Sequence, residues 1–118
     1  MSIFKNGLIN NETIKDLETD LSKGEFCALV EMYLQQSVKQ LASIVEAIEN
    51  GELEKLKYQV HKEASSSLIF GLEEYGYYLR KIERDIDLDR YDSNSVDVDL
   101  IQDLMTKSHS VLRQALPD

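Results

Sequence analysis

A single proline, Pro117, occurs among the 118 residues, and it is the penultimate residue of the chain. Proline removes a backbone donor and clashes with the preceding helical turn, so a chain without internal proline can form long uninterrupted helices. Apolar residues recur at helical spacing through most of the sequence, whereas apolar and polar residues alternate only over the four residues 96–99. The sequence therefore predicts an all-α protein.

The apolar spacing predicts one short N-terminal helix followed by four longer ones. Residues that favour helix caps or breaks mark the expected ends. These are Asn10, Asn11, Gly24, Asn50, Gly51, Gly71 and Ser95. Short connections favour antiparallel neighbours, so we expect one domain over residues 1–118, an up-and-down antiparallel four-helix bundle with the additional N-terminal helix.

The stripes expected to face the core share this spacing. They are Ile14, Leu17 and Leu21; Phe26, Leu29, Val30, Tyr33, Leu34, Leu41, Ile44, Val45 and Ile48; Leu53, Leu56, Val60, Ala64 and Ser67; Leu72, Tyr75, Leu79, Ile82 and Ile86; and Leu100, Ile101, Leu104, Met105, Ser108, Val111 and Leu112.

The formal net charge of −9 excludes some classes of partner. So negative a surface repels nucleic-acid phosphates and anionic lipid, so we expect neither a nucleic-acid nor a membrane partner. Cys27 is the only cysteine, which rules out an intrachain disulfide or a cage of thiolate metal ligands. With no apolar run long enough to span a bilayer, the sequence predicts a cytoplasmic protein, and its size and charge favour a monomer.

His61 is expected near the solvent edge of the third helix, one position after a predicted core residue. Its neighbours on the same face are Lys57, Ala64, Ser65 and Leu68. Small side chains would let another protein approach the ring, and a lysine could pair with phosphoryl oxygens. A neutral imidazole is also a competent nucleophile. Spacing alone leaves open the alternative that His61 is a surface histidine with no function.

Residues 60–71, Val-His-Lys-Glu-Ala-Ser-Ser-Ser-Leu-Ile-Phe-Gly, resemble the phosphoacceptor motif of histidine phosphotransfer domains. His61, Ser66, Ser67, Phe70 and Gly71 match that motif without a gap, the last four as its packing residues. The spaced apolar positions and the Leu-Glu position that follow in the family are matched by Tyr75, Leu79, Ile82 and Glu83. The resemblance extends over about residues 12–116.

The resemblance implies a stand-alone phosphorelay intermediate, in which His61 accepts a phosphoryl group on Nε2 from an aspartate of a receiver domain and passes it to another receiver. Response-regulator receivers or a hybrid sensor kinase would be the partners, and the receiver would supply Mg²⁺. On this view the chain is a phosphocarrier without enzymatic turnover or a cofactor of its own. Side chains expected to support the phosphoryl group or the docking are Lys57, Lys62, Ala64, Ser65 and Leu68.

Three residues after the histidine depart from the family pattern. Glu63 stands at an apolar position, Ala64 at the position of a lysine and Ser65 at that of a glycine. Lys57 or Lys62 could replace the lysine that is thought to orient the phosphoryl group. The departures keep two alternatives open, a module of the same fold that docks a receiver or kinase without being phosphorylated, and a purely structural helical adaptor.

An acidic run has a simpler interpretation than the metal site that it suggests. Asp85, Asp87 and Asp89 are spaced like the ligands of a helix-loop-helix calcium site, but Arg90 and Val96 stand where that site needs glycine and glutamate. We expect a solvated acidic connection.

Other single residues are given structural roles. His109 has no partner at metal-ligand spacing and is expected to be structural or at the surface, and Cys27 to be a half-buried packing residue. Gly76 lies inside a predicted helix at a cost of about 1 kcal/mol relative to alanine, which indicates the close approach of a helix or a partner.

Overall fold

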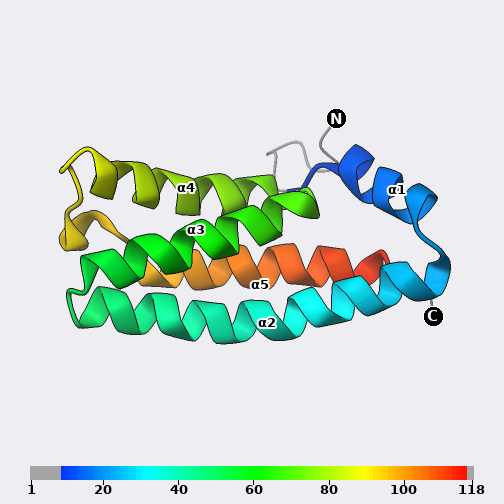
Figure 1. Cartoon of the computed structure of the whole chain (residues 1–118), viewed down its shortest axis with the longest axis horizontal. Coiled ribbons are helices and arrows are strands. Elements are labelled where there is room, and N and C mark those ends of the chain that lie inside the picture. Colours follow the sequence, from blue (N-terminus) through cyan, green and yellow to red (C-terminus); the bar gives the residue numbers. More distant parts are fainter. Residues whose placement is uncertain (1–8, 117–118) are drawn as a thin grey trace.

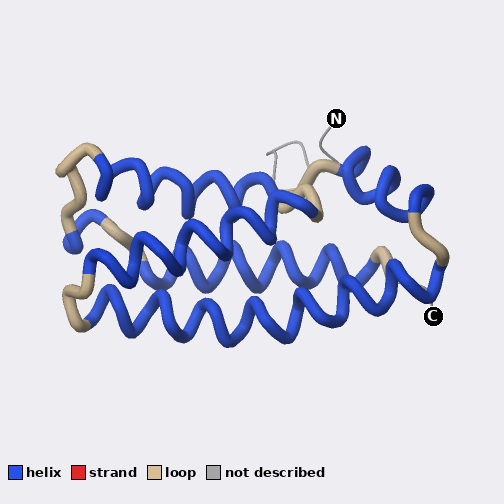
Figure 2. Tube along the Cα trace, in the orientation of Figure 1, coloured by secondary structure: helices blue, strands red, loops and turns tan. Residues whose placement is uncertain are grey.

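A computed structural model describes residues 9–116, and within that range the chain is helical without strands (Figure 2). This confirms the predicted all-α class. The elements are α1 (Asn11–Asp20), α2 (Lys23–Glu49), α3 (Leu53–Ile69), α4 (Glu73–Asp87), the short 3-10 helix η1 (Ser93–Ser95) and α5 (Val98–Gln114). Pro117, on which the first sequence argument rests, lies outside the described residues.

The four long helices form an up-and-down bundle, with α1 at one end of it (Figure 1). In this bundle α3 packs between α2 and α4, and α5 completes the bundle by packing on α2 and α4. The 27 residues of α2 correspond to about 40 Å of helix at 1.5 Å per residue. This matches the longest dimension of the molecule, 42 Å, so α2 runs along the whole structure.

Three of the predicted helix ends are confirmed. The Asn10 side chain accepts hydrogen bonds from the first turn of α1 and so caps it. Gly51 and Gly71 follow α2 and α3 with φ angles of 66° and 73°, the left-handed conformation that glycine adopts without strain. Both glycines therefore stop a helix and turn the chain back antiparallel to it.

Two predicted boundaries are wrong, because a better cap lies beside each. Gly24 lies inside α2, which begins at Lys23 after a capping box formed by Ser22 and Glu25. The last helix is capped by Asp97, whose side chain accepts from the Leu100 backbone N–H at 3.0 Å, and Ser95 lies in η1.

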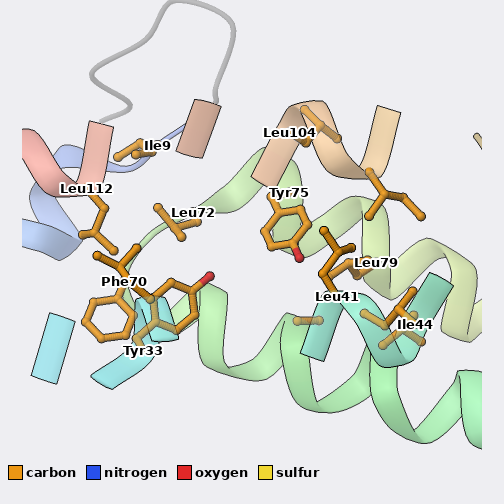
Figure 3. Packing of buried hydrophobic residues seen from close by; sticks show 14 of the residues in the cluster. Ile9, Tyr33, Leu41, Ile44, Phe70, Leu72, Tyr75, Leu79, Leu104 and Leu112 are labelled. Carbon is orange, nitrogen blue, oxygen red and sulfur yellow. The ribbon is translucent and has the colours of Figure 1, made fainter. Parts of the chain in front are cut away.

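The core is built mainly from the predicted stripes, and Leu56, Val60 and Ala64 are its α3 members. Figure 3 shows large core side chains of α2, α4 and α5 packed together with Phe70 and Leu72. Within the core the rings of Tyr33 and Phe70 lie with their centroids 4.8 Å apart. Leu29, Leu53 and Leu100 were expected in the core but are exposed, since each sits at the margin of its stripe. No helix in the described range is long and apolar enough to cross a membrane.

Candidate functional site

His61 lies in the middle of α3 with its side chain 55% exposed. Val60 and Ala64 on either side of it are fully buried. Consecutive helical residues are rotated by about 100°, so the step from Val60 to His61 takes the ring out of the core to the solvent edge beside α4. The sequence prediction for His61 is confirmed in this respect.

Glu83 on α4 holds the His61 ring in place. Nδ1 of the ring lies 2.8 Å from Oε2 of Glu83. A carboxylate oxygen accepts, so Nδ1 carries the proton, and in the neutral ring Nε2 is then the unprotonated nitrogen. Within residues 9–116, Nε2 of His61 has no hydrogen-bond partner. The pair therefore presents a nucleophilic nitrogen to solvent in a fixed tautomer.

The register between α3 and α4 explains how Glu83 reaches the ring. A Cβ atom on Gly76 would lie 2.7 Å from Leu68, so the missing side chain lets the two helices approach closely there. Leu68 is seven residues after His61, and Gly76 is seven residues before Glu83. Since the helices are antiparallel, the same register brings His61 opposite Glu83. The close approach predicted for Gly76 is confirmed.

A third pair continues this register one turn earlier on α3. Nζ of Lys57 lies 2.5 Å from Oδ1 of Asp87. The hydrogen bond to Asp87, and then the charge of that carboxylate, raise the pKa of Lys57, and the charge of Glu83 adds to the effect. A protonated lysine therefore stands on the same face of α3 as His61, close enough to Glu83 to feel its charge.

No family model matches the sequence, and no curated protein matches it. Among solved structures, the chain is similar to the histidine-containing phosphotransfer protein B (HptB) from Pseudomonas aeruginosa PAO1, at a TM-score of 0.80 and 14% sequence identity. The match covers 91% of this chain and 92% of that one. This chain has the histidine phosphotransfer fold. At 14% identity the similarity shows the fold alone, so any inference about chemistry depends on the side chains of this chain.

The motif residues after His61 build the end of α3 in this histidine phosphotransfer fold. Ser67 is fully buried, and its hydroxyl lies 2.8 Å from that of Tyr33, whereas Ser66 is half-buried. Phe70 packs on the same tyrosine ring. These contacts agree with the packing role that the resemblance implied.

Gly71 ties the end of α3 to the start of α1. Its carbonyl oxygen accepts a hydrogen bond from the Asn10 N–H at 2.7 Å. A Cβ atom at position 71 would come within 2.7 Å of the Asn10 carbonyl oxygen. Only a glycine fits both the turn and this close approach.

The residues predicted to dock a partner do not all lie on the surface. Lys62 is exposed, with Nζ 5.2 Å from the centroid of the Tyr58 ring, and Ser65 is half-buried. Ala64 is fully buried, so its prediction as a docking residue is wrong. Leu68, also predicted to dock a partner, is half-buried against Gly76, because α4 approaches so closely there.

Sequence reasoning missed a buried polar cluster to which all four long helices contribute. Its members are Tyr33 and Ser37 on α2, Glu63 and Ser67 on α3, Tyr75 on α4 and His109 on α5. The carboxylate of Glu63 accepts from the Tyr75 hydroxyl at 2.7 Å and from Ser37. Oγ of Ser37 also lies 3.0 Å from Nε2 of His109, which links α2 to α5 within the cluster.

Burial dominates the electrostatics of this cluster. It raises the pKa of Glu63 to about 7, against the opposing effect of the two donors. It lowers the pKa of His109 to about 4, with a smaller contribution from the Arg113 charge. The predicted structural role of His109 is thus confirmed. The burial of Glu63 could have been inferred from the sequence, because Glu63 lies seven residues, or two helical turns, after the core position Leu56.

Metal ligation has no support in the described range. No group of three or more His, Cys, Asp or Glu side chains within residues 9–116 is arranged to hold an ion. Asp85 lies in the last turn of α4, and its carboxylate pairs with Arg90 in the following connection at 3.5 Å.

Proposed function

We propose that this chain is a phosphocarrier that accepts a phosphoryl group on Nε2 of His61 from the aspartyl phosphate of a receiver domain and passes it to the aspartate of another receiver. The observation that carries the proposal is the exposed ring with Nδ1 held 2.8 Å from Glu83. The histidine phosphotransfer fold makes the receiver the expected partner.

The proposed transfer would use this geometry. The Nε2 lone pair of His61 attacks phosphorus, the N–P bond forms, and the bond from phosphorus to the aspartate oxygen breaks, so the carboxylate leaves with that electron pair. The ring then carries the phosphoryl group on Nε2 and a proton on Nδ1, which makes it cationic. The carboxylate of Glu83 stabilises that positive charge through the hydrogen bond it already makes, and the reverse step regenerates the neutral ring.

Lys57 is the candidate for neutralising the phosphoryl oxygens. It lies one turn before His61 on the same face and is held by Asp87 in the unphosphorylated chain. A dianionic phosphoryl group competes with a single carboxylate for the ammonium, so Lys57 would turn from Asp87 toward His61 on phosphorylation. Lys62 is directed to the Tyr58 ring and serves better as a docking charge.

The docking face would consist of exposed side chains around the ring. Lys62 and Ser65 are accessible there, and the exposed Tyr58 and Ile69 add apolar area. The partner would bring the Mg²⁺ and the aspartate, because phosphoryl transfer needs positioning and charge neutralisation more than groups on the nucleophile. Such an interface is small and partly electrostatic, so we expect weak, salt-sensitive binding by a monomer.

The test is transfer of label from phosphorylated receiver domains to the purified chain. Wild type should take up acid-labile, alkali-stable label, and His61→Gln should take up none. Glu83→Ala should label about ten- to a hundredfold more slowly, the loss typical of removing a group that orients a histidine. Glu46→Ala, at an exposed position on α2, is the matched control for Glu83→Ala and should label like wild type.

Two outcomes contradict the proposal. If His61→Gln labels as well as wild type, the acceptor is another residue. If no donor labels the wild type although one receiver binds it, the chain is a docking module of the same fold.

A further inference from the structure

A groove runs between α2 and α3, on the side of α3 that faces away from α4. Its volume is about 360 Å³, within the usual size range of ligand sites. It is lined by Leu29, Met32, Tyr33, Gln36, Ser37, Gln40, Lys62, Glu63, Ser66, Ile69 and Phe70. The His61 ring faces α4 on the other side of α3, and of the docking face only Lys62 and Ile69 also line this groove, so the rest of the groove needs its own explanation.

One end of the groove is apolar. Leu29 and Met32 come from the first half of α2, and Ile69 and Phe70 from the end of α3 and the residue after it. Because the two helices are antiparallel, these side chains share one end. Met32 and Ile69 are 60% and 57% exposed, which is high for large apolar side chains and leaves them available to a ligand.

The other end is polar and has unused hydrogen-bonding capacity. Glu63 is only 2% exposed yet lines the groove, and its hydrogen bonds to Ser37 and Tyr75 both use Oε2. Within residues 9–116, Oε1 has no hydrogen-bond partner. Nε2 of Gln40 is also buried without a partner there. The amide can be turned over to present its oxygen, so this end offers two acceptors to one donor group.

Charge favours a cation at the polar end. The chain carries a net charge of −9, which attracts cations. The Lys62 ammonium lies over the exposed Tyr58 ring and not on Glu63. The carboxyl of Glu63 already receives two donors on Oε2, an arrangement that favours its role as an acceptor.

We propose that this groove binds a small amphiphilic amine, with its apolar stem against Met32 and Ile69 and its ammonium on the carboxylate of Glu63. The site goes beyond phosphotransfer and does not depend on phosphorylation. Its ligand displaces the proton from Glu63 and replaces it by an ion pair. Binding therefore strengthens as that carboxyl ionises.

The pH range of the effect is defined by the groups that surround Glu63. Tyr33 on α2 and Tyr75 on α4 have pKa values raised by burial, so both stay neutral, and the pKa of His109 on α5 is lowered to about 4. Within this cluster only Glu63, with a pKa of about 7, titrates between about pH 6 and pH 8. Its ionised fraction rises about tenfold over that interval.

The experiment compares three six-carbon probes on the isotopically labelled full chain by NMR titration. Hexylammonium should saturate with shifts at Met32, Gln40 and Glu63, about tenfold more tightly than hexanol, and hexanoate should bind more weakly still. The affinity for hexylammonium should rise about tenfold from about pH 6 to pH 8, while that for hexanol stays level.

Variants separate the head-group contact from the stem contact. Glu63→Gln should abolish the preference for ammonium over hexanol and the pH dependence together. Met32→Ser, at an exposed position, should weaken both probes alike, and His61→Gln should change neither. Equal binding of hexanol and hexylammonium to wild type, or ammonium shifts scattered over the surface without saturation, would overturn the proposal.

Discussion

A buried acid with a raised pKa makes a folded protein less stable as the pH rises. Replacement of Glu63 by glutamine should remove this effect, so that the stability of the variant rises with pH instead. The side chain is 2% exposed, and burial raises its pKa from 4.5 to about 7. A carboxyl with this change costs about 3 kcal/mol of folding free energy once it is ionised. Glutamine has nearly the same shape and does not titrate, so the difference between the two proteins isolates this cost.

The sign follows from proton binding. Below pH 4.5 Glu63 is protonated in the folded and the unfolded chain, and its full contribution to stability is present. As the pH rises toward about 7 the unfolded chain loses this proton first, so the folded state becomes less stable, and above that pH the whole contribution is lost. The advantage of Glu63→Gln over wild type should therefore grow by about 3 kcal/mol across this window.

His109 has the opposite effect in wild type. Its pKa falls from 6.5 to about 4, so the stability that it contributes is present above pH 6.5 and is lost as the pH falls through about 4. From pH 4.5 to 6.5 the two contributions oppose each other, and wild type should change little. In Glu63→Gln nothing opposes the His109 contribution, so the free energy of unfolding should rise with pH by about 2–3 kcal/mol over the same window.

Urea unfolding followed by circular dichroism measures both curves, with free energies extrapolated to water at several pH values from about 4.5 to 8. A constant offset between the two proteins is expected from the changed hydrogen bonds to Ser37 and Tyr75 and does not affect the test. If the difference between the curves does not change with pH, Glu63 does not hold its proton in the folded state and the reasoning about the buried cluster is refuted.

Three further substitutions test local features by the same unfolding assay. Gly71→Ala should destabilise by about 2 kcal/mol or more, because φ is 73° and the new Cβ would lie 2.7 Å from the Asn10 carbonyl oxygen; a loss under half of this would contradict the predicted strain. Gly24→Ala, with nothing within 4 Å, should stabilise by about 0.5–1 kcal/mol, and any destabilisation would count against it. Asp97→Ala should cost about 1 kcal/mol by removing the cap of α5, while an unchanged value would mean that another group caps it.

The fold could be predicted because its determinants are local in sequence. The helical stripes, the cap at Asn10 and the glycines at 51 and 71 each act within one or two turns. The two errors at helix ends arose where competing caps are neighbours in sequence. Ser22 and Asp97 are the actual N-caps, because their side chains accept from the backbone N–H three residues later, which spacing alone does not show.

The candidate site was predictable only in part, because it depends on contacts between helices. The motif identified His61 and included Glu83 as a patterned position, but a helical stripe does not say which neighbour it meets. The pairing of Lys57 with Asp87 joins residues 30 apart, and the Ser37 and His109 contact joins residues 72 apart. The burial of Glu63 went unrecognised because its charge argued for the surface, whereas its position in the helix argued for the core.

Two of the three departures from the phosphotransfer motif, Glu63 and Ala64, can now be separated from the proposed phosphoacceptor His61. Glu63 and Ala64 are buried, so at these two positions the sequence differs from the motif inside the core, where Ser37 and Tyr75 satisfy the carboxyl. A lysine at position 64 would bring a charge to a fully buried site, whereas Lys57 provides a cation one turn before His61 at no such cost. The exposed ring, the carboxylate that holds its Nδ1 and the neighbouring cation then share one register between α3 and α4. A module that only docks needs none of these three to be aligned, so their alignment favours the phosphocarrier.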